Sequence, residues 1–206
     1  MKLNAGDATL KKGKVAFFVT GNVHKFHEAR DVLKEFGIST AMLNIDTSEI
    51  QADDVEVIAK TSAVEAAKKS GMPIFVEDAG LFIDVLKGFP GPYSSYVYRT
   101  LSTGGILRLM KGAIQREARF YSAVAFSDSG KANSAKCFIG KVDGKIAYKE
   151  QGKMGFGFDP IFAPSAEPHK TFAEITQQEK NKHSHRAEAL RKFGSWYVNH
   201  YAQSDL

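Results

Sequence analysis

The sequence has one cysteine, Cys137, and no apolar run approaching the about 20 residues that a membrane-spanning helix needs. A single cysteine excludes an internal disulfide and is typical of a reducing compartment. Residues 1–14 are polar and lysine-rich without an apolar core, so they do not resemble a secretory signal, and we expect a flexible leader there. We find no internal repeat, low-complexity tract or linker. We therefore expect a cytoplasmic protein with one domain over residues 15–206 and no membrane partner.

The composition is that of an ordinary globular protein with a basic balance. Hydrophobic residues make up 43% of the 206 positions and charged residues 25%, which suffices for a substantial core. The net charge is +5 and the pI about 9.1, which favours anionic partners. Nucleotides, polyphosphates and nucleic acid all meet that description, and charge alone does not choose among them.

Strand-like and helix-like patterns alternate in the first part of the chain. Apolar runs at residues 15–19, 41–45 and 74–81 predict buried strands, and the segments 23–36 and 53–69 between them have helical periodicity. This alternation predicts an α/β fold with a partly parallel sheet.

The later chain has a different pattern. Residues 117–126, 135–142 and 146–148 are β-rich, with turns at 127–130 and 143–144, and predict antiparallel hairpins that either extend the sheet or form a second lobe. We expect Cys137 to be a packed strand residue, although nucleophilic catalysis by its thiol is conceivable. Ser94 or Ser95 can cap a helix, and residues 106–110 predict a further short one.

Glu77 and Asp78 end the apolar run that begins at Ile74, and Gly80 permits a sharp exit from that strand. Ligands of open α/β sheets bind at the carboxyl ends of strands, and Mg²⁺ is held by one or two carboxylates together with substrate phosphates. Glu49 is another carboxylate just after a predicted strand. The simpler interpretation of these residues is a solvated turn.

Asn22 follows the first predicted strand and is a favoured helix N-cap, which places Lys25 in the first helical turn. A cation there opposes the helix dipole. Either it pairs with Glu28 three residues later, or it joins Asn22 and the free backbone N–H groups in binding an anion.

Glycine alternates with aromatic residues at positions 152–162, a segment that ends in Asp159-Pro160. Glycine permits close backbone approach to a ligand, and an aromatic ring offers a stacking face for a base. A tight loop with packed phenylalanines is the alternative.

Thr176 and Glu179 form a capping box before a basic segment. On one straight helix Lys180, His185 and Arg186 would point in different directions. Their convergence on a ligand therefore requires a break, for which Ser184 is a good N-cap.

Together these motifs resemble the inosine triphosphate pyrophosphatase family. The matching segments fall in family order and are Thr20-Gly21-Asn22-x-x-Lys25, Glu77-Asp78-x-Gly80-Leu81, residues 86–91, Phe156-Gly157-Phe158-Asp159-Pro160 and Glu179-Lys180-Asn181-x-x-Ser184-His185-Arg186. They span nearly the whole chain, and residues 93–99 look most like archaeal members.

The resemblance implies a homodimeric α/β protein with a long twisted mixed β-sheet flanked by helices, and a central cleft between two lobes. It implies Mg²⁺-dependent cleavage of ITP, dITP or XTP between the α- and β-phosphates, which keeps these nucleotides out of nucleic acid. Asp78 would be the general base and a Mg²⁺ ligand with Glu49, supported by Glu77. The implied substrate-binding residues are Thr20, Gly21, Asn22, Lys25, Ala79, Phe156, Gly157, Phe158, Asp159, Lys180, His185 and Arg186.

The sequence departs from the family pattern at two places. Ala79 stands where many members have serine or threonine, so it offers only its backbone N–H. No lysine stands near Ser62, and we expect Lys60 to face elsewhere. Two alternatives stay open: a pyrophosphatase for other modified or pyrimidine nucleoside triphosphates, and a basic nucleic-acid-binding protein. We rank the second low and expect no stable nucleic-acid partner, because the basic residues lie beside carboxylates and glycine turns.

Overall fold

The computed structural model describes residues 15–48, 50–128, 130–131 and 135–201. The leader expected at residues 1–14 and the expected metal ligand Glu49 lie outside the described residues. The strands are β1 (Val15–Val19), β2 (Ser39–Leu43), β3 (Ile74–Ile83), β4 (Pro90–Gly91), β5 (Glu117–Ser127), β6 (Lys136–Ile146) and β7 (Phe162–Pro164). The α-helices are α1 (Val23–Leu33), α2 (Val55–Ser70), α3 (Ser94–Leu109), α4 (Gln177–His183) and α5 (His185–Trp196).

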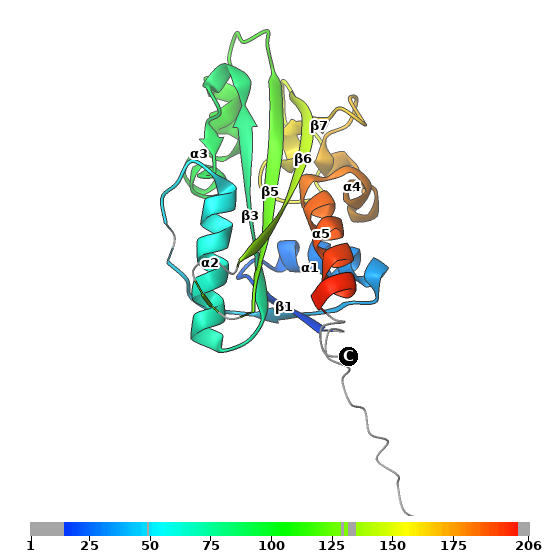
Figure 1. The fold of residues 1–206 in the computed structure, drawn as a ribbon. Helices are drawn as coiled ribbons and strands as arrows, with labels where there is room; N and C mark the ends of the chain where they lie inside the picture. The colour runs from blue at the N-terminus through cyan, green and yellow to red at the C-terminus, as the bar shows by residue number, and fades with distance from the viewer. Residues whose placement is uncertain (1–14, 49, 129, 132–134, 202–206) are drawn as a thin grey trace, which may run out of the picture.

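All seven strands belong to one mixed sheet in the order β2-β1-β3-β5-β6-β7, with β4 also paired to β3. β1 is parallel to β2 and β3, whereas β3, β5, β6 and β7 pair antiparallel. The predicted hairpins therefore extend the first sheet. The long strands β3, β5 and β6 run the length of the molecule in Figure 1, and the short β1 crosses its lower end.

Successive strand residues alternate between the two faces of this sheet, and each face is covered by different helices. Phe18 and Phe75 pack with α1 and α5, whereas Val19, Ile74 and Val76 pack with α2. A third core around Leu81 and Ile83 lies with α3 and β7 at the other end of the long strands, towards the top of Figure 1. The molecule thus has a core on each face at one end and another at the far end.

Most of the predicted helix ends agree with the structure because they depend on local chemistry. The Asn22 side chain caps α1, and Gly37 ends the helical segment with a positive φ of 69°. α2 ends before Gly71 as predicted, but it begins at Val55 after the cap Asp54, two residues later than expected. None of the described helices is long and apolar enough to cross a membrane.

The prediction that the strand ends at its carboxylates is wrong. β3 continues through Glu77, Asp78 and Gly80 to Ile83, because β5 pairs with it along its full length. Gly80 is not an exit from the strand. A side chain there would lie 2.5 Å from the Gly91 carbonyl oxygen of β4, so glycine permits the two strands to approach.

Three other local predictions are also wrong. Gly144 was expected in a turn but lies within β6, where it pairs with Ala118, so residues 135–148 do not form two strands. Neither Ser94 nor Ser95 caps α3. Ser94 lies inside the helix, and its hydroxyl accepts a bond from the Leu81 N–H and donates one to the Gly91 carbonyl. The predicted short helix at 106–110 is part of α3, which is kinked at Ser102.

Candidate active site

The carboxylates lie where one edge of β3 lacks a partner among the described strands. β1 pairs with Ile74 and Phe75 on that edge, and β4 pairs with Leu81 and Phe82, which leaves residues 76–80 open between them. Two cavities of about 590 and 520 Å³ meet in this gap and share the residues Thr20, Gly21, Asp78, Pro92 and Ser95. We call them the α5-side cavity, which contains His185 and Phe156, and the α2-side cavity, which contains Ser62 and Arg99.

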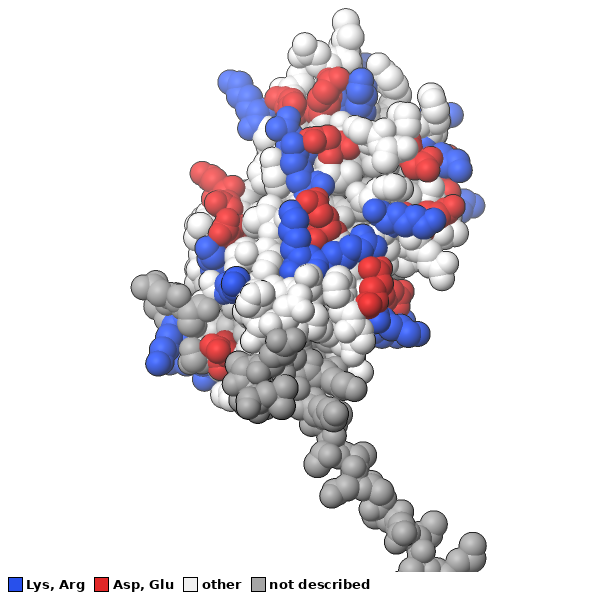
Figure 2. Space-filling model, turned by 45° about the vertical axis from the view of Figure 1, so that its right-hand side comes forward, with Lys and Arg blue, Asp and Glu red and all other residues white. Residues whose placement is uncertain are grey.

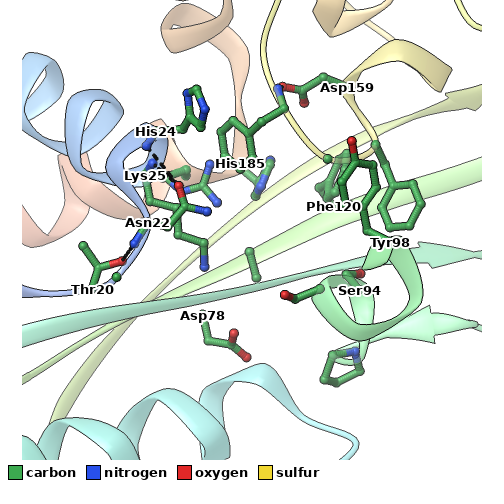
Figure 3. Close-up of a pocket in the computed structure, with 18 of the residues that line it drawn as sticks. Thr20, Asn22, His24, Lys25, Asp78, Ser94, Tyr98, Phe120, Asp159 and His185 are labelled. Carbon is green, nitrogen blue, oxygen red and sulfur yellow. Dashed lines mark hydrogen bonds between the residues drawn. The ribbon is translucent and has the colours of Figure 1, made fainter. Parts of the chain in front are cut away.

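The pleat of β3 separates the two adjacent carboxylates. Glu77 points to the face covered by α1 and α5, where it meets Lys25 and Arg186. Asp78 points to the opposite face, and in Figure 3 it lies on the α2 side of the strand. Alternate side chains of one strand face opposite sides, and among the described Asp and Glu residues Asp78 alone lines both cavities.

The backbone at Ala79 faces the open gap. The Glu77 carbonyl accepts a bond from Lys25 Nζ at 3.3 Å, and the Leu81 N–H donates to Ser94 Oγ at 2.8 Å, both on the unpaired side of β3. In a strand, backbone groups two residues apart point the same way, so the Ala79 N–H also points into the gap. The donor expected at this position is therefore accessible to a ligand.

The predicted turn at Thr20 forms a tight entry to α1. Asn22 Oδ1 accepts bonds from the N–H groups of His24 (2.9 Å) and Lys25 (3.1 Å), and the Asn22 N–H donates to Thr20 Oγ1. Lys25 does not pair with Glu28 as one alternative predicted. Its ammonium reaches Glu77 Oε2 at 2.9 Å, which brings the start of α1 against the middle of β3.

Beneath the α5-side cavity lies a buried network of three cations and three carboxylates. Arg186 pairs with Glu28 and with Glu77 (3.1 Å), and Lys180 pairs with Glu28 (2.9 Å) and Asp159 (2.6 Å). With the Lys25–Glu77 pair, each cation in this cavity meets at least one carboxylate. Apart from Lys25, these side chains are almost wholly buried, so each charge depends on its partners.

The pKa values follow from this burial and pairing. Burial opposes the charge of Glu28, but Arg186 and Lys180 outweigh it and lower the Glu28 pKa to about 2. Burial also opposes the charge of Glu77, but the positive charges of Arg186 and Lys25 outweigh it and lower the pKa of Glu77. Burial raises the pKa of Asp159. Burial, reinforced by Arg186, lowers the pKa of His185 well below its usual value, so His185 is a neutral imidazole at neutral pH.

Aromatic rings line the rest of the α5-side cavity (Figure 3). The His24 and Phe156 rings are stacked with their centroids 5.2 Å apart, and His185 stacks on Phe120 at 4.5 Å. The Phe156 N–H donates to Asp159 Oδ2, which ties the glycine-aromatic loop to the charge network. Gly157 and Phe158 line the same cavity, so of the predicted segment 152–162 the structure brings residues 156–159 to it.

The predicted break at Ser184 is confirmed and explains how the basic residues converge. α4 ends at His183, and Ser184 caps α5 through a bond from the Ala187 N–H. The start of α5 lies directly on β6 at Gly140, where any side chain would overlap the His185 carbonyl. This packing brings His185 and Arg186 beside Lys180 and towards β3.

Sequence reasoning missed Glu28, His24, Phe120 and Ser122. Glu28 was considered only as a partner for Lys25. A carboxylate on the same helical face as the buried Ala29 and Val32 was a usable signal, because an unpaired charge is not left on a buried stripe. His24, Phe120 and Ser122, whose hydroxyl donates to Glu77 at 2.6 Å, had no local signal.

Two expectations concern residues that play no visible part in the cavities. Lys60 pairs with Glu56 on the exposed face of α2 and lines neither cavity, as expected. Cys137 is partly buried in β6, and burial raises the pKa of its thiol to about 12, which keeps it protonated. It is therefore a packing residue.

The described residues contain no cluster of three or more His, Cys, Asp or Glu side chains suited to a metal. Asp78 is the described carboxylate that reaches both cavities, and Thr47 and Gln51 add oxygen atoms to the α2-side cavity. Hard oxygen donors of this kind fit Mg²⁺, which needs only one or two carboxylates when phosphates complete its coordination.

The fold and the cleft define an α/β protein with a nucleotide-sized site at an interrupted edge of its sheet. Comparison with known proteins identifies the family: the Ham1 family model matches residues 16–196, and the chain belongs to the Ham1 family. It is 45% identical over 185 residues to a dITP/XTP pyrophosphatase of Methanopyrus kandleri, covering 90% of this chain and 97% of that protein. A second dITP/XTP pyrophosphatase, from Ignicoccus hospitalis, is 48% identical over 87% of this chain and 94% of its own length.

Solved structures agree with this assignment. A HAM1 protein from Coxiella burnetii superposes with a TM-score of 0.77 at 27% identity, covering 89% of this chain and 98% of that one. The Staphylococcus aureus Ham1 protein gives a TM-score of 0.74 at 25% identity, covering 90% and 98%. The mixed sheet with its flanking helices is therefore the fold of the family, as the sequence motifs implied.

Proposed function

We propose that this protein hydrolyses aberrant purine nucleoside triphosphates, such as ITP, dITP and XTP, to the nucleoside monophosphate and pyrophosphate. The observation that carries the proposal is the junction of the two cavities at Asp78. An aromatic cavity suited to a base meets a carboxylate at the open edge of β3, and a second cavity continues beyond it. The names of the relatives support the same substrate class.

In this proposal the base lies against Phe156 in the α5-side cavity. The phosphates then pass the Thr20–Asn22 turn, where the Ala79 N–H offers a hydrogen-bond donor and the positive end of the α1 dipole favours an anion. The β- and γ-phosphates continue into the α2-side cavity. This path places the α-phosphate beside Asp78, which is where cleavage into monophosphate and pyrophosphate requires it.

Base selectivity would come from hydrogen-bond donors that line the α5-side cavity. Arg186 has five N–H groups, and its carboxylate partners engage only Nη1 and Nε, so other N–H groups remain for a ligand. Lys180, neutral His185 and backbone N–H groups complete the set. A purine 6-oxo group accepts such bonds, whereas the 6-amino group of adenine would leave donors unpaired at a cost of about 1–3 kcal/mol each.

Hydrolysis needs a positioned water molecule and neutralised phosphate charge. Asp78 would accept a proton from water as the water oxygen bonds to the α-phosphorus and the bond to the bridging oxygen breaks, with pyrophosphate as leaving group. Asp78, together with Glu49 by the family resemblance, would hold Mg²⁺, which offsets phosphate charge when bound. Removal of Mg²⁺ by a chelator should abolish turnover, and added Mg²⁺ should restore it.

Glu77 has a different role in this proposal from the metal-supporting one first expected. Its carboxylate is engaged by Lys25, Arg186 and the Ser122 hydroxyl. We therefore assign Glu77 to positioning the two cations.

A nucleotide panel tests the proposal. Phosphate released from ITP, dITP, XTP, ATP and dUTP is measured with malachite green, with and without added inorganic pyrophosphatase. The expected result is phosphate from ITP and XTP only when pyrophosphatase is added. Direct release of orthophosphate, or preference for ATP, would refute it, and preference for dUTP would favour the pyrimidine alternative.

Two further parts of the proposal concern partners. On the face seen in Figure 2, basic and acidic side chains are interspersed. Lys192 pairs with Glu188 within α5, and Arg191 of α5 pairs with Glu35. Nucleic-acid binding would need a continuous basic surface, so this face gives that alternative no support. The homodimer implied by the resemblance and the cytoplasmic location expected from the composition belong to the proposal, and light scattering of the purified protein tests the dimer.

A further inference from the structure

The α2-side cavity is poor in positive charge for a site that would receive two phosphates. Among its described lining residues Arg99 is the single Lys or Arg. Asp78 also lines the cavity, whereas the Glu77 carboxylate is directed to the opposite face, where Lys25 and Arg186 pair with it. Arg99 lies on α3 one helical turn after Ser95 and Tyr96, which line the same cavity. Residues three and four apart share one face of a helix, so Arg99 lies on the cavity-facing side of α3.

The cations of the α5-side cavity do not supply the missing charge. Lys25, Lys180 and Arg186 are each paired with carboxylates, and three cations against Glu28, Glu77 and Asp159 leave little net charge. Arg99, in contrast, makes no ion pair with any carboxylate in the described part of the chain. It is also exposed, so an incoming anion would not have to displace an internal partner.

We propose that Arg99 binds the pyrophosphate part of the substrate, and so provides the phosphate-binding cation of the α2-side cavity. This inference rests on the proposed function and gives a binding role to a residue to which neither the motifs nor the resemblance had assigned one. A guanidinium suits the role because its planar N–H groups can donate two parallel bonds to phosphate oxygens. Ser62 on α2 lines the same cavity, so the site lies between α2 and α3.

The test separates the two products as inhibitors of ITP hydrolysis. In Arg99→Gln, the inhibition constant of pyrophosphate should rise about 10- to 100-fold, the range for losing hydrogen bonds to a charged group. The inhibition constant of IMP should stay within about 2-fold of wild type, because IMP does not enter the α2-side cavity. The value of kcat/KM for ITP should fall in parallel with the loss of pyrophosphate affinity.

Two further variants ask whether charge at this place is what matters. Arg99→Lys should keep part of the pyrophosphate affinity, and Ser62→Lys combined with Arg99→Gln should restore part of it from the opposite side of the cavity. Arg108→Gln is the matched control, because Arg108 is an exposed arginine of the same helix that lines neither cavity. It should leave both inhibition constants unchanged.

Several results would overturn the inference while leaving the proposed function intact. These are an unchanged pyrophosphate constant in Arg99→Gln, an equal rise for IMP and pyrophosphate, or a defect that neither lysine variant relieves. Failure of the proposed function is distinguishable, because wild type would then not convert ITP to IMP and pyrophosphate at all. Thermal melting of each variant checks folding, and the exposed position of Arg99 predicts little change.

Discussion

Replacing Glu28 by glutamine should strongly destabilise the protein, because Glu28 pairs with both Lys180 and Arg186 in the interior. Glutamine keeps the size of the side chain but removes its charge, which leaves two buried cations with less compensation. Removal of one partner from a buried ion pair costs about 3–5 kcal/mol. The pKa gives a similar figure: a decrease from 4.5 to about 2 corresponds to about 3 kcal/mol in favour of the ionised, folded form.

The same interaction has a defined pH dependence. The pKa of Glu28 is lower in the folded state than in the unfolded chain, so its contribution is complete above the unfolded value and is lost as the pH falls from 4.5 towards about 2. The free-energy difference between wild type and Glu28→Gln should therefore be largest near neutral pH and shrink at about pH 3. Above about pH 6 the difference should be constant, because Glu28 is then ionised in both states.

Urea unfolding of both proteins at several pH values measures this difference. For a domain of this size, about 3–5 kcal/mol corresponds to a decrease in Tm of roughly 6–20 °C. Glu35→Gln is the matched control, since Glu35 pairs with Arg191 on the exposed surface and should contribute less than about 1 kcal/mol. A loss below about 1 kcal/mol in Glu28→Gln, or a loss independent of pH, would refute the role of the buried network.

Three other predictions concern the site. Asp78→Asn should abolish ITP turnover while IMP binding and the melting temperature stay near wild type; surviving activity would contradict the assignment of the general base. If His24 adds a second aromatic surface beside the base, His24→Ala should weaken IMP binding by up to about 10-fold. His27→Ala, on the exposed face of the same helix, is the control and should leave IMP binding unchanged. Equal effects of the two substitutions would exclude the stacking role. Gly140→Ala should destabilise the protein by about 1–3 kcal/mol, because the added methyl group would overlap the His185 carbonyl. Gly104→Ala is the control, because a side chain there has no neighbour nearer than 3.8 Å, and it should be neutral or stabilising. Thermal melts of both variants measure the difference.

Local chemistry made parts of the fold predictable. Asn22, Thr176 and Ser184 cap helices where the sequence indicates, since a cap depends on a side chain and backbone groups within three residues of it. The strand that carries Asp78 was found by its apolar run, but its end was misplaced. Its continuation past Gly80 depends on pairing with β5, which lies about forty residues further along the chain.

The residues of the candidate site also fall into two groups, those that the sequence indicates and those that it does not. The cavity-lining residues Thr20, Asp78, Phe156 and Lys180 belong to short motifs that the sequence displays, so their convergence could be anticipated. No such pattern gave Glu28 or His24 a place in the site, and the run at residues 93–99 gave Arg99 no binding role. Their places depend on how α1 and α3 pack against the sheet, which is the sum of many distant contacts.

By itself, the sequence determined that this protein has an α/β fold, helix starts at Asn22 and Ser184, and two adjacent carboxylates that follow a buried apolar run. Only the tertiary structure decided that Glu77 serves the buried cations while Asp78 faces both cavities. The reason is the position of that strand. β1 and β4 pair with different parts of the same edge of β3, and the residues of β3 between them lie open at the two cavities. Because side chains alternate along a strand, Glu77 and Asp78 face opposite sides there.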